Sequence, residues 1–491
     1  MKDNKLWAEA LSQISDGHLD EAAEPQRKQR FSWAGILAGA LAAAMLAMIL
    51  LPTGFLFLIF QGAGGAEPTT GHPGTTATKD PTEHLDGIPP ELVSLAASPR
   101  NQSALDKAAV SQKTRLSTPS RYDFFLESSR LLLSGTGENA LWSPVNAWLN
   151  LAMTARLTAG TSRQEILDAL GATDLDTLTA QASALWEATY MDEAAGTCLL
   201  ANSVWIDTLC DFERGAMDAL AYELYASVFR ADFDAPQTGD MIRSWINEHT
   251  GGLLTDAVRS LDVPEDAFIA LFSTICFRGR WTDEFHPEHS APGVFRTPGG
   301  VVSCTFMKKD AYSTRYCWGS NFSAVGLSMR NGAQMWFILP DEGISVDRIL
   351  ADESYLILAA SDFDSVTGSY SWTDSRNAKV NLSIPKFDIS GQIEQDAMLQ
   401  ALGITQAFDP DTADFSQALP GSHAYLQNIS QAVRVTVDEE GLTAAAFTAN
   451  IPGSAPPPEE IIDFVLDRPF LFVIEKAGVP LFVGTVNDPT A

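Results

Sequence analysis

The stretch from residue 432 to residue 474 limits what this chain can fold into more than any other part of the sequence. It begins with an alternating, strand-like run at 432–437, passes through three acidic residues and reaches Gly441, which can take φ values that other residues avoid. Small residues follow, and then a segment at 451–458 too rich in proline and glycine for a regular helix or a central strand. The stretch closes in an apolar, strand-like run at 470–474. The pattern predicts a long exposed loop between two strands.

Two interpretations of this loop stay open on its residues alone. Residues 443–450 have fair helix propensity, so the loop can be a surface connection with a single helical turn. Alternatively, the consecutive alanines at 444–446 are small so that the loop can become a strand inside a packed sheet, where larger side chains would overpack. In that case Gly441 supplies the turn at the entry point.

Hydrophobic periodicity predicts regular elements in the rest of the chain. Helical spacing predicts helices over 121–133, 147–157 and 161–170. Apolar or alternating runs predict strands at 199–207, 270–277 and 379–389. The predicted elements therefore include both helices and strands.

The hinge of the loop resembles that of the serpins, a family of serine protease inhibitors. The serpin hinge pattern is Glu-Glu-Gly-x-x-Ala-Ala-Ala, and it corresponds here to Glu439, Glu440, Gly441, Leu442, Thr443, Ala444, Ala445 and Ala446. Other serpin-like motifs occur in the family's order: the turn at 139–146, a strand that leads to Trp281 and Phe285, the Pro-Lys-Phe segment at 385–387, and the tail at 468–489. The resemblance implies the serpin fold, which is of the α+β class, with a large mixed sheet A, smaller sheets B and C, about nine helices and an exposed reactive-centre loop.

The serpin "shutter", a polar patch beneath the main sheet, corresponds to Ser143, Asn146, Ser273 and Gln431. Asn146 and Ser273 stand where the family often has serine and asparagine, and Gln431 stands where it usually has histidine. All remain polar and can re-form a hydrogen-bonded patch. Equally open is the interpretation that these substitutions changed a contact in the core without any effect on function.

The resemblance implies suicide inhibition of a serine protease. The protease attacks the loop and forms a covalent acyl complex, after which the cleaved loop inserts into the main sheet. If the family register holds, the side chains of Leu442, Ala444, Ala446 and Thr448 face inward after insertion. Leu442 is unusual at the hinge, and Pro452 lacks the N–H that an inserted strand needs. A non-inhibitory serpin, acting as a binding or chaperone-like surface module, is the alternative.

The family's usual spacing from Gly441 places the specificity residue at Ala455. Proteases cleave poorly before proline, so the Ser454–Ala455 bond competes with the Ala455–Pro456 bond. The scissile region therefore comprises Gly453, Ser454, Ala455 and Pro456. These residues do not suit a trypsin-like pocket, and an elastase- or subtilisin-like target is expected.

The amino-terminal third predicts a tether. Residues 1–30 are polar and end in a basic cluster, and no charged residue occurs from 32 to 60. This run exceeds the apolar region of a cleaved signal peptide and is long enough to cross a bilayer. We therefore expect a cytoplasmic tail at 1–30, a transmembrane helix at 31–61, a flexible Gly/Thr/Pro-rich linker at 62–104 and an extracellular serpin domain at 105–491. A single-pass bacterial membrane protein is the overall expectation.

Composition excludes several function classes. A net charge of −30 argues against nucleic-acid or anionic-membrane partners. The seven histidines are scattered and no catalytic motif occurs, so we expect no enzyme, no metal and no cofactor. The five cysteines fit no metal pattern, and buried free thiols are expected, with a Cys198–Cys210 bridge as the alternative.

Overall fold

The computed structural model describes residues 93–96, 119–193, 196–250, 252, 255, 268–351, 355, 374–426, 429–441 and 461–491. The chain divides into two compact units, Met1–Thr78 and Lys79–Ala491, and every described residue belongs to the second unit. The predicted tail at 1–30 and the predicted membrane helix at 31–61 lie outside the described residues. Within the described part, no helix has the length and apolar character needed to span a membrane.

The described residues form eight α-helices, close to the number that the resemblance implies. They are α5 (Pro119–Leu133), α6 (Pro144–Leu157), α7 (Gly160–Ala169), α8 (Leu175–Thr189), α9 (Arg214–Glu223), α10 (Pro236–His249), α11 (Val346–Leu350) and α13 (Asp396–Ala401). The helices predicted at 121–133, 147–157 and 161–170 correspond to α5, α6 and α7. Helix α6 begins three residues earlier than predicted, because Pro144 occupies a first-turn position where its missing N–H leaves no hydrogen bond unmade.

A five-stranded mixed sheet, here termed the main leaf, carries the strand order β1-β5-β4-β3, and β6 pairs with the other edge of β4. Its strands are β1 (Val93–Ala96), β3 (Met191–Glu193), β4 (Gly196–Asp207), β5 (Ala226–Ala231) and β6 (Ile269–Gly279). Strands β4 and β6 are the strands predicted at 199–207 and 270–277. Strand β1 falls within the linker predicted at 62–104, so these four residues pair in a sheet instead of remaining a spacer.

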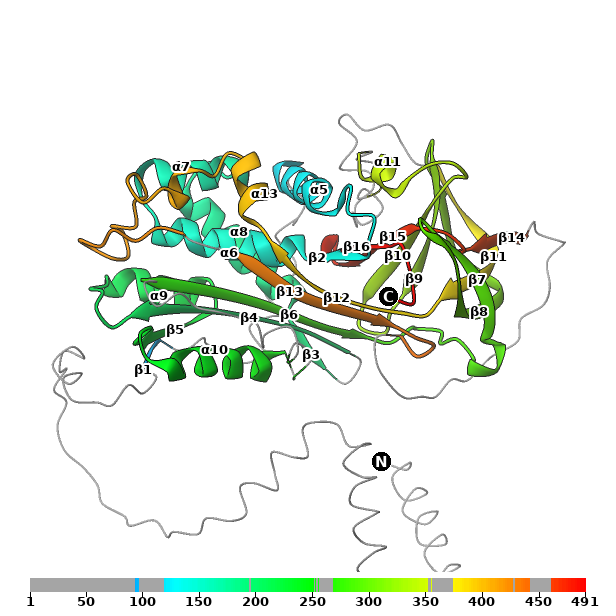
Figure 1. Cartoon of the computed structure of the whole chain (residues 1–491), viewed down its shortest axis with the longest axis horizontal. Coiled ribbons are helices and arrows are strands. Elements are labelled where there is room, and N and C mark those ends of the chain that lie inside the picture. The colour runs from blue at the N-terminus through cyan, green and yellow to red at the C-terminus, as the bar shows by residue number, and fades with distance from the viewer. Residues whose placement is uncertain are drawn as a thin grey trace, which may run out of the picture. The chain divides into compact units, whose positions relative to one another are not determined.

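Helices cover both faces of the main leaf, which explains why β4 is a nearly continuous apolar run. Helices α6 and α8 contact one side through β6 and β4, and α10 contacts the same two strands from the other side (Figure 1). On the α10 side, Trp205 of β4 packs with Phe229 of β5 at 4.5 Å between ring centroids. Ile242 and Trp245 of α10 complete this smaller core.

A nine-stranded sheet contains the two smaller sheets that the resemblance predicts. Its order is β14-β11-β8-β9-β10-β15-β16-β2, with β7 paired to β8. The strands are β2 (Ala140–Trp142), β7 (Ala291–Thr297), β8 (Gly300–Trp318), β9 (Phe322–Ser328), β10 (Ala333–Pro340), β11 (Asp374–Pro385), β14 (Ile461–Val465), β15 (Phe470–Lys476) and β16 (Val479–Val486). The long strand β8 pairs with β11 and β7 and also with β9, so it joins the two sheets into one.

Strands β12 (Phe387–Glu394) and β13 (Ser430–Val437) form an antiparallel pair, here termed the hinge ribbon. One edge of β13 pairs with β12, and its other edge lies against β6 (Figure 1). Within the described residues, however, no ladder of backbone hydrogen bonds joins β13 to β6. The main leaf and the hinge ribbon are therefore adjacent but not paired along this boundary.

The single strand predicted at 379–389 is wrong in one respect, since two strands occupy it. Strand β11 ends at Pro385 and β12 begins at Phe387. The N–H of Lys386 still donates to the Thr305 carbonyl of β8 at 2.9 Å, next to the pair of Pro385 and Phe306. From Phe387 onward the chain pairs with β13 instead. The break places the Lys386 side chain at the end of the hinge ribbon.

All five cysteines are free, as the sequence predicts, and four of them are buried. Cys198 lies near the start of β4 and Cys210 beyond its end, which rules out the alternative Cys198–Cys210 bridge. Burial raises the pKa of the Cys198 thiol to about 12, so it is an inert thiol at neutral pH.

Candidate functional site: the hinge and the shutter

A tight turn connects β13 to Gly441. The Asp438 carboxylate accepts the backbone N–H groups of Glu440 and Gly441 at 3.0 and 3.2 Å. Burial is the main cause that raises the pKa of Asp438, and these two hydrogen bonds offset part of that effect. The turn thus fixes the backbone direction in which the chain leaves β13.

Gly441 lies where no side chain fits. Its φ is +125°, which L side chains rarely adopt. A Cβ atom at this position would lie 2.5 Å from the Gly279 carbonyl oxygen and 2.7 Å from the Arg280 Cα. Both contacts are with backbone atoms, so no side-chain rotation can relieve them.

The segment that follows β6 holds the turn through backbone groups. The N–H of Trp281 donates to the Glu440 carbonyl at 3.2 Å, and the N–H of Phe285 donates to the Glu439 carbonyl at 2.9 Å. The Trp281 indole N–H donates to the Asp438 carbonyl at 3.0 Å. The ends of β6 and β13 are therefore joined at the hinge, although their lengths are not paired.

The side chain of Glu439, in the described part of the hinge, is buried, with 8% of its surface exposed. Its carboxylate receives the Lys386 ammonium at 2.5 Å and the Ser290 hydroxyl at 2.7 Å. Burial by itself would raise the pKa of Glu439, but Lys386 and Ser290 outweigh it and hold the pKa below the ordinary value. The ionised carboxylate thus connects the hinge to the start of β12 and to the residue before β7.

The structure brings the four predicted shutter residues together in two pairs. In the first pair, Gln431 of β13 accepts the Ser143 N–H at 2.8 Å and donates to the Ser143 carbonyl at 3.1 Å. The Ser143 hydroxyl donates to the Leu481 carbonyl at 2.7 Å. The residue before α6 is thereby bound to the hinge ribbon.

The second pair binds α6 to the main leaf. The Asn146 amide donates to the Ser273 carbonyl of β6 at 2.9 Å, and the Ser273 hydroxyl contacts the Asn146 amide oxygen. The same hydroxyl lies 2.7 Å from the amide oxygen of Asn202, whose own amide donates to the Leu224 carbonyl at 3.2 Å. Since a hydroxyl carries one hydrogen, only one of the two amide oxygens can accept it at a time.

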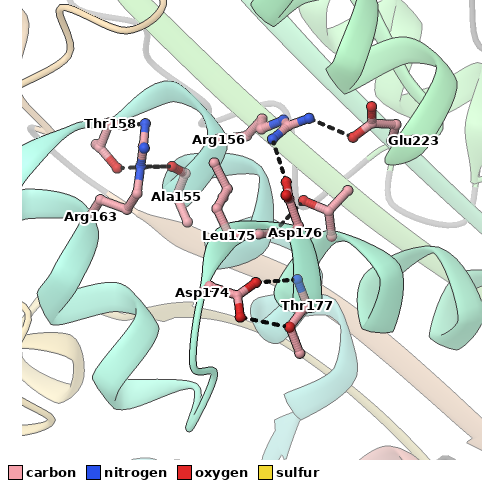
Figure 2. A network of polar contacts seen from close by, with 10 residues as sticks. Ala155, Arg156, Thr158, Arg163, Asp174, Leu175, Asp176, Thr177 and Glu223 are labelled. Atoms are coloured by element: carbon pink, nitrogen blue, oxygen red, sulfur yellow. Dashed lines mark hydrogen bonds and ion pairs between the residues drawn. The ribbon is translucent and has the colours of Figure 1, made fainter.

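Helix α6 is fixed at its far end by charges (Figure 2). Arg156 pairs with Glu223 of α9 at 2.7 Å and lies 3.9 Å from Asp176 of α8. Arg163 of α7 donates to the Ala155 carbonyl at 3.1 Å. The helix that carries Asn146 is therefore joined to α7, α8 and α9.

The family model described as "Serpin (serine protease inhibitor)" matches residues 122–489. The chain belongs to the serpin family. It is similar to Serpin-ZX of Arabidopsis thaliana, with 27% identity over 376 residues covering 72% of this chain and 92% of the relative. It is also similar to plasminogen activator inhibitor 1 of Sus scrofa, with 25% identity over 385 residues covering 75% and 91%.

Solved serpin structures show the same fold. The native state of the thermophilic serpin tengpin aligns with a TM-score of 0.66 at 25% identity, covering 75% of this chain and 93% of that one. Arabidopsis AtSerpin1 in its native stressed conformation aligns with a TM-score of 0.64 at 26% identity, covering 76% and 97%. Serpin-ZX and AtSerpin1 come from a plant and plasminogen activator inhibitor 1 comes from an animal, and these relatives give no support to a bacterial origin. Serpins are generally inhibitors, which agrees with the expectation that this protein is not an enzyme.

The sequence does not indicate the partners of the Glu439 side chain. In the sequence, Lys386 belongs to the Pro-Lys-Phe segment, and no motif marks Ser290. Nothing in the spacing along the sequence indicates these contacts, because they join residues far apart in the chain. The remaining hinge residues at 442–446 and the scissile region at 453–456 lie outside the described residues.

We expect Glu439→Gln to destabilise this serpin by about 1–2 kcal/mol at pH 7, because a partly buried ion pair is lost while a hydrogen-bond acceptor for Ser290 remains. The folded-state pKa of Glu439 is below its ordinary value of 4.5, so its contribution is present above that value and is lost as the pH falls through the folded pKa. Urea unfolding at pH 7 and at successively lower pH checks this. The exposed Glu342→Gln is the matched control, and a pH-independent difference for Glu439→Gln would contradict the prediction.

We expect the shutter pair Asn146 and Ser273 to be energetically coupled. Asn146→Ser removes a hydrogen bond, and Ser273→Asn adds volume beside Asn146, so each single change should cost about 1–2 kcal/mol. The double exchange restores one amide and one hydroxyl, in the arrangement often seen in serpins. It should recover about 1 kcal/mol relative to the sum of the single changes. A double-mutant cycle by urea unfolding measures this interaction free energy between positions 146 and 273. Additive effects of the two single changes would refute the coupling.

Proposed function

We propose that this serpin is a suicide inhibitor of serine proteases that acts by cleavage and insertion of its reactive-centre loop. The observation that carries the proposal is the unpaired boundary between β6 and β13, with Gly441 at its end. Both strands end at the hinge, so a segment that turns back from Gly441 would run antiparallel to each of them. The loop that follows Gly441 is therefore connected to the place where a new strand can add hydrogen bonds on both sides.

The reaction needs no catalytic group on this chain. The serine of the protease attacks the scissile carbonyl, the peptide bond breaks, and the new amino terminus departs while the acyl ester remains. The freed loop then pairs with β6 and β13. At about 1 kcal/mol net for each hydrogen bond, a full strand contributes on the order of 10 kcal/mol, which is available to distort the protease before deacylation.

The predicted scissile region supports a small-residue specificity. Ser454 and Ala455 offer no positive charge to an acidic specificity pocket and no large ring to a deep apolar one. We propose an elastase- or subtilisin-like serine protease as the partner. The non-inhibitory alternative is less favoured, because plasminogen activator inhibitor 1 is among the named relatives and the hinge keeps its glycine and alanines.

We propose further that the inhibitor acts at a membrane surface. The uncharged run at 32–60 and the preceding basic cluster support one spanning helix at 31–61 with its amino terminus in the cytoplasm. The serpin domain would then face the outside, where secreted proteases are found. Fractionation combined with protease protection of intact cells tests this orientation.

The first experiment mixes the full-length protein with pancreatic elastase, with subtilisin and with trypsin as the control. A complex that survives denaturing electrophoresis, with release of a carboxyl-terminal fragment, is expected for elastase or subtilisin and not for trypsin. The mass of the fragment identifies the scissile bond. Clean cleavage without a complex for every protease would refute inhibition by trapping.

A further inference from the structure

Strand β1 is an element outside the serpin match, which begins at residue 122. It pairs antiparallel with β5, with Val93 opposite Arg230 and Ser94 opposite Phe229. A bulge follows, and Ala96 then pairs with Val228. A strand that precedes the matched domain is therefore added to the edge of the main leaf (Figure 1).

The edge that β1 covers belongs to a buried strand. Val228 and Phe229 of β5 are 0% and 8% exposed, and Phe229 packs against Trp205 of β4. Without β1, β5 would be the outer strand of the main leaf, with its backbone groups unpaired on one side. The four residues of β1 thus close an edge of the sheet that takes part in loop insertion.

Strand β1 also contacts helix α9. That helix is tied to α6 by the ion pair between Glu223 and Arg156 at 2.7 Å (Figure 2). Helix α6 in turn hydrogen-bonds to β6 through Asn146 and follows Ser143, which is bonded to Gln431 of β13. Strand β1 therefore connects the outer edge of the main leaf to the helices that hold the leaf against the hinge ribbon.

Entry of a strand between β6 and β13 requires the main leaf to shift relative to the hinge ribbon and α6. We propose that β1 is a strap that restrains this shift, so that the amino-terminal segment controls how readily the boundary between the main leaf and the hinge ribbon opens. The proposal rests on loop insertion as the function. Residues 93–96 would then be a regulatory element. Detaching them from β5, for example after proteolysis of the preceding chain, would make the boundary between β6 and β13 easier to open.

The test uses the full-length protein with Ser94→Pro and Leu95→Pro, which remove two N–H groups from β1. The matched control carries Thr75→Pro and Thr76→Pro, in the same predicted linker but outside β1. A second variant lacks residues 93–96 and separates loss of the strap from a general effect of proline. Hydrogen–deuterium exchange is measured over 226–231, over 269–279 and over 430–437, and the annealing rate of a fluorescent synthetic peptide with the sequence of residues 442–455 is measured in parallel.

Both strap variants are expected to exchange faster over 226–231 and to anneal the peptide about five- to tenfold faster than the control, as loss of one or two hydrogen bonds implies. Faster exchange over 226–231 with unchanged peptide annealing would show that β1 does not restrain the shift of the main leaf. Unchanged exchange over 226–231 would show that β1 does not pair with β5. If the peptide anneals to no variant, the insertion function fails. Hydrogen exchange over 269–279 and 430–437 then tests by itself whether β1 restrains the boundary between β6 and β13. Faster exchange in the strap variants supports the restraint, and unchanged exchange refutes it.

Discussion

Replacing Ala444 with arginine is expected to turn the protein from an inhibitor into a cleaved substrate. Under the proposed register, the side chain of residue 444 faces the interior of the main sheet once the loop inserts. A guanidinium without a partner costs several kcal/mol to bury, and this cost falls on the inserted state alone. Insertion would then be slower than deacylation. We expect about a hundredfold fewer trapped complexes for each cleavage event, the ratio that about 3 kcal/mol implies.

The matched control for this prediction is Ala445→Arg. Residue 445 is the neighbour of residue 444 before the scissile region, and the substitution introduces the same charge. Its side chain, however, faces solvent in the inserted strand. The two variants are titrated against the protease that forms a complex with the unmodified protein, and complex and cleaved product are quantified on denaturing gels. Equal inhibition by the two variants would show that the loop does not insert in this register.

The sequence predicts a hinge at Gly441 because local chemistry favours a turn there. Gly441 follows an alternating strand, and the structure places it at a φ that needs glycine and against backbone that excludes a Cβ. Strands β4 and β6 were likewise predicted from apolar runs, since helices bury both of their faces. Such features depend on a few consecutive residues and can be recognised without a structure.

Long-range contacts could not be predicted in this way. In the sequence Glu439 is one of three consecutive acidic residues and nothing distinguishes it from the other two, yet its side chain is buried against Lys386 and Ser290. Periodicity also merged β11 and β12 into one strand, because the alternation continues through Pro385 although the partner strand changes from β8 to β13 at this point. In both cases the outcome depends on where distant segments pack.

Strand β1 could not be predicted from the sequence for a different reason. The residues around it are rich in small and turn-forming types, and that composition favours a spacer. A four-residue strand gains little from its own sequence, and it forms here because β5 offers an unpaired edge. The edge, and not the propensity of residues 93–96, decides the structure.

Gly441→Ala is expected to lower the stability of the native protein more than the addition of a methyl group at any other hinge position. The added Cβ would lie 2.5 Å from the Gly279 carbonyl oxygen, and the φ of +125° would be strained for alanine. We expect the native protein to lose about 3 kcal/mol or more, because the backbone of the turn or of the end of β6 must move. Thermal unfolding of the uncleaved protein measures this loss.

The same substitution should have little effect once the loop has been cleaved and inserted. In that state residue 441 enters an extended strand, where alanine needs neither a positive φ nor close contact with the end of β6. Gly300→Ala is the control, since Gly300 also has a positive φ, +152°, but no atom lies within 4 Å of the added Cβ. Gly300→Ala should lower the melting temperature of uncleaved and cleaved protein equally, whereas Gly441→Ala should lower only that of the uncleaved form. An equal loss in both forms for Gly441→Ala would mean that the hinge keeps its native turn after cleavage, and the loop would then have no route into the boundary between β6 and β13.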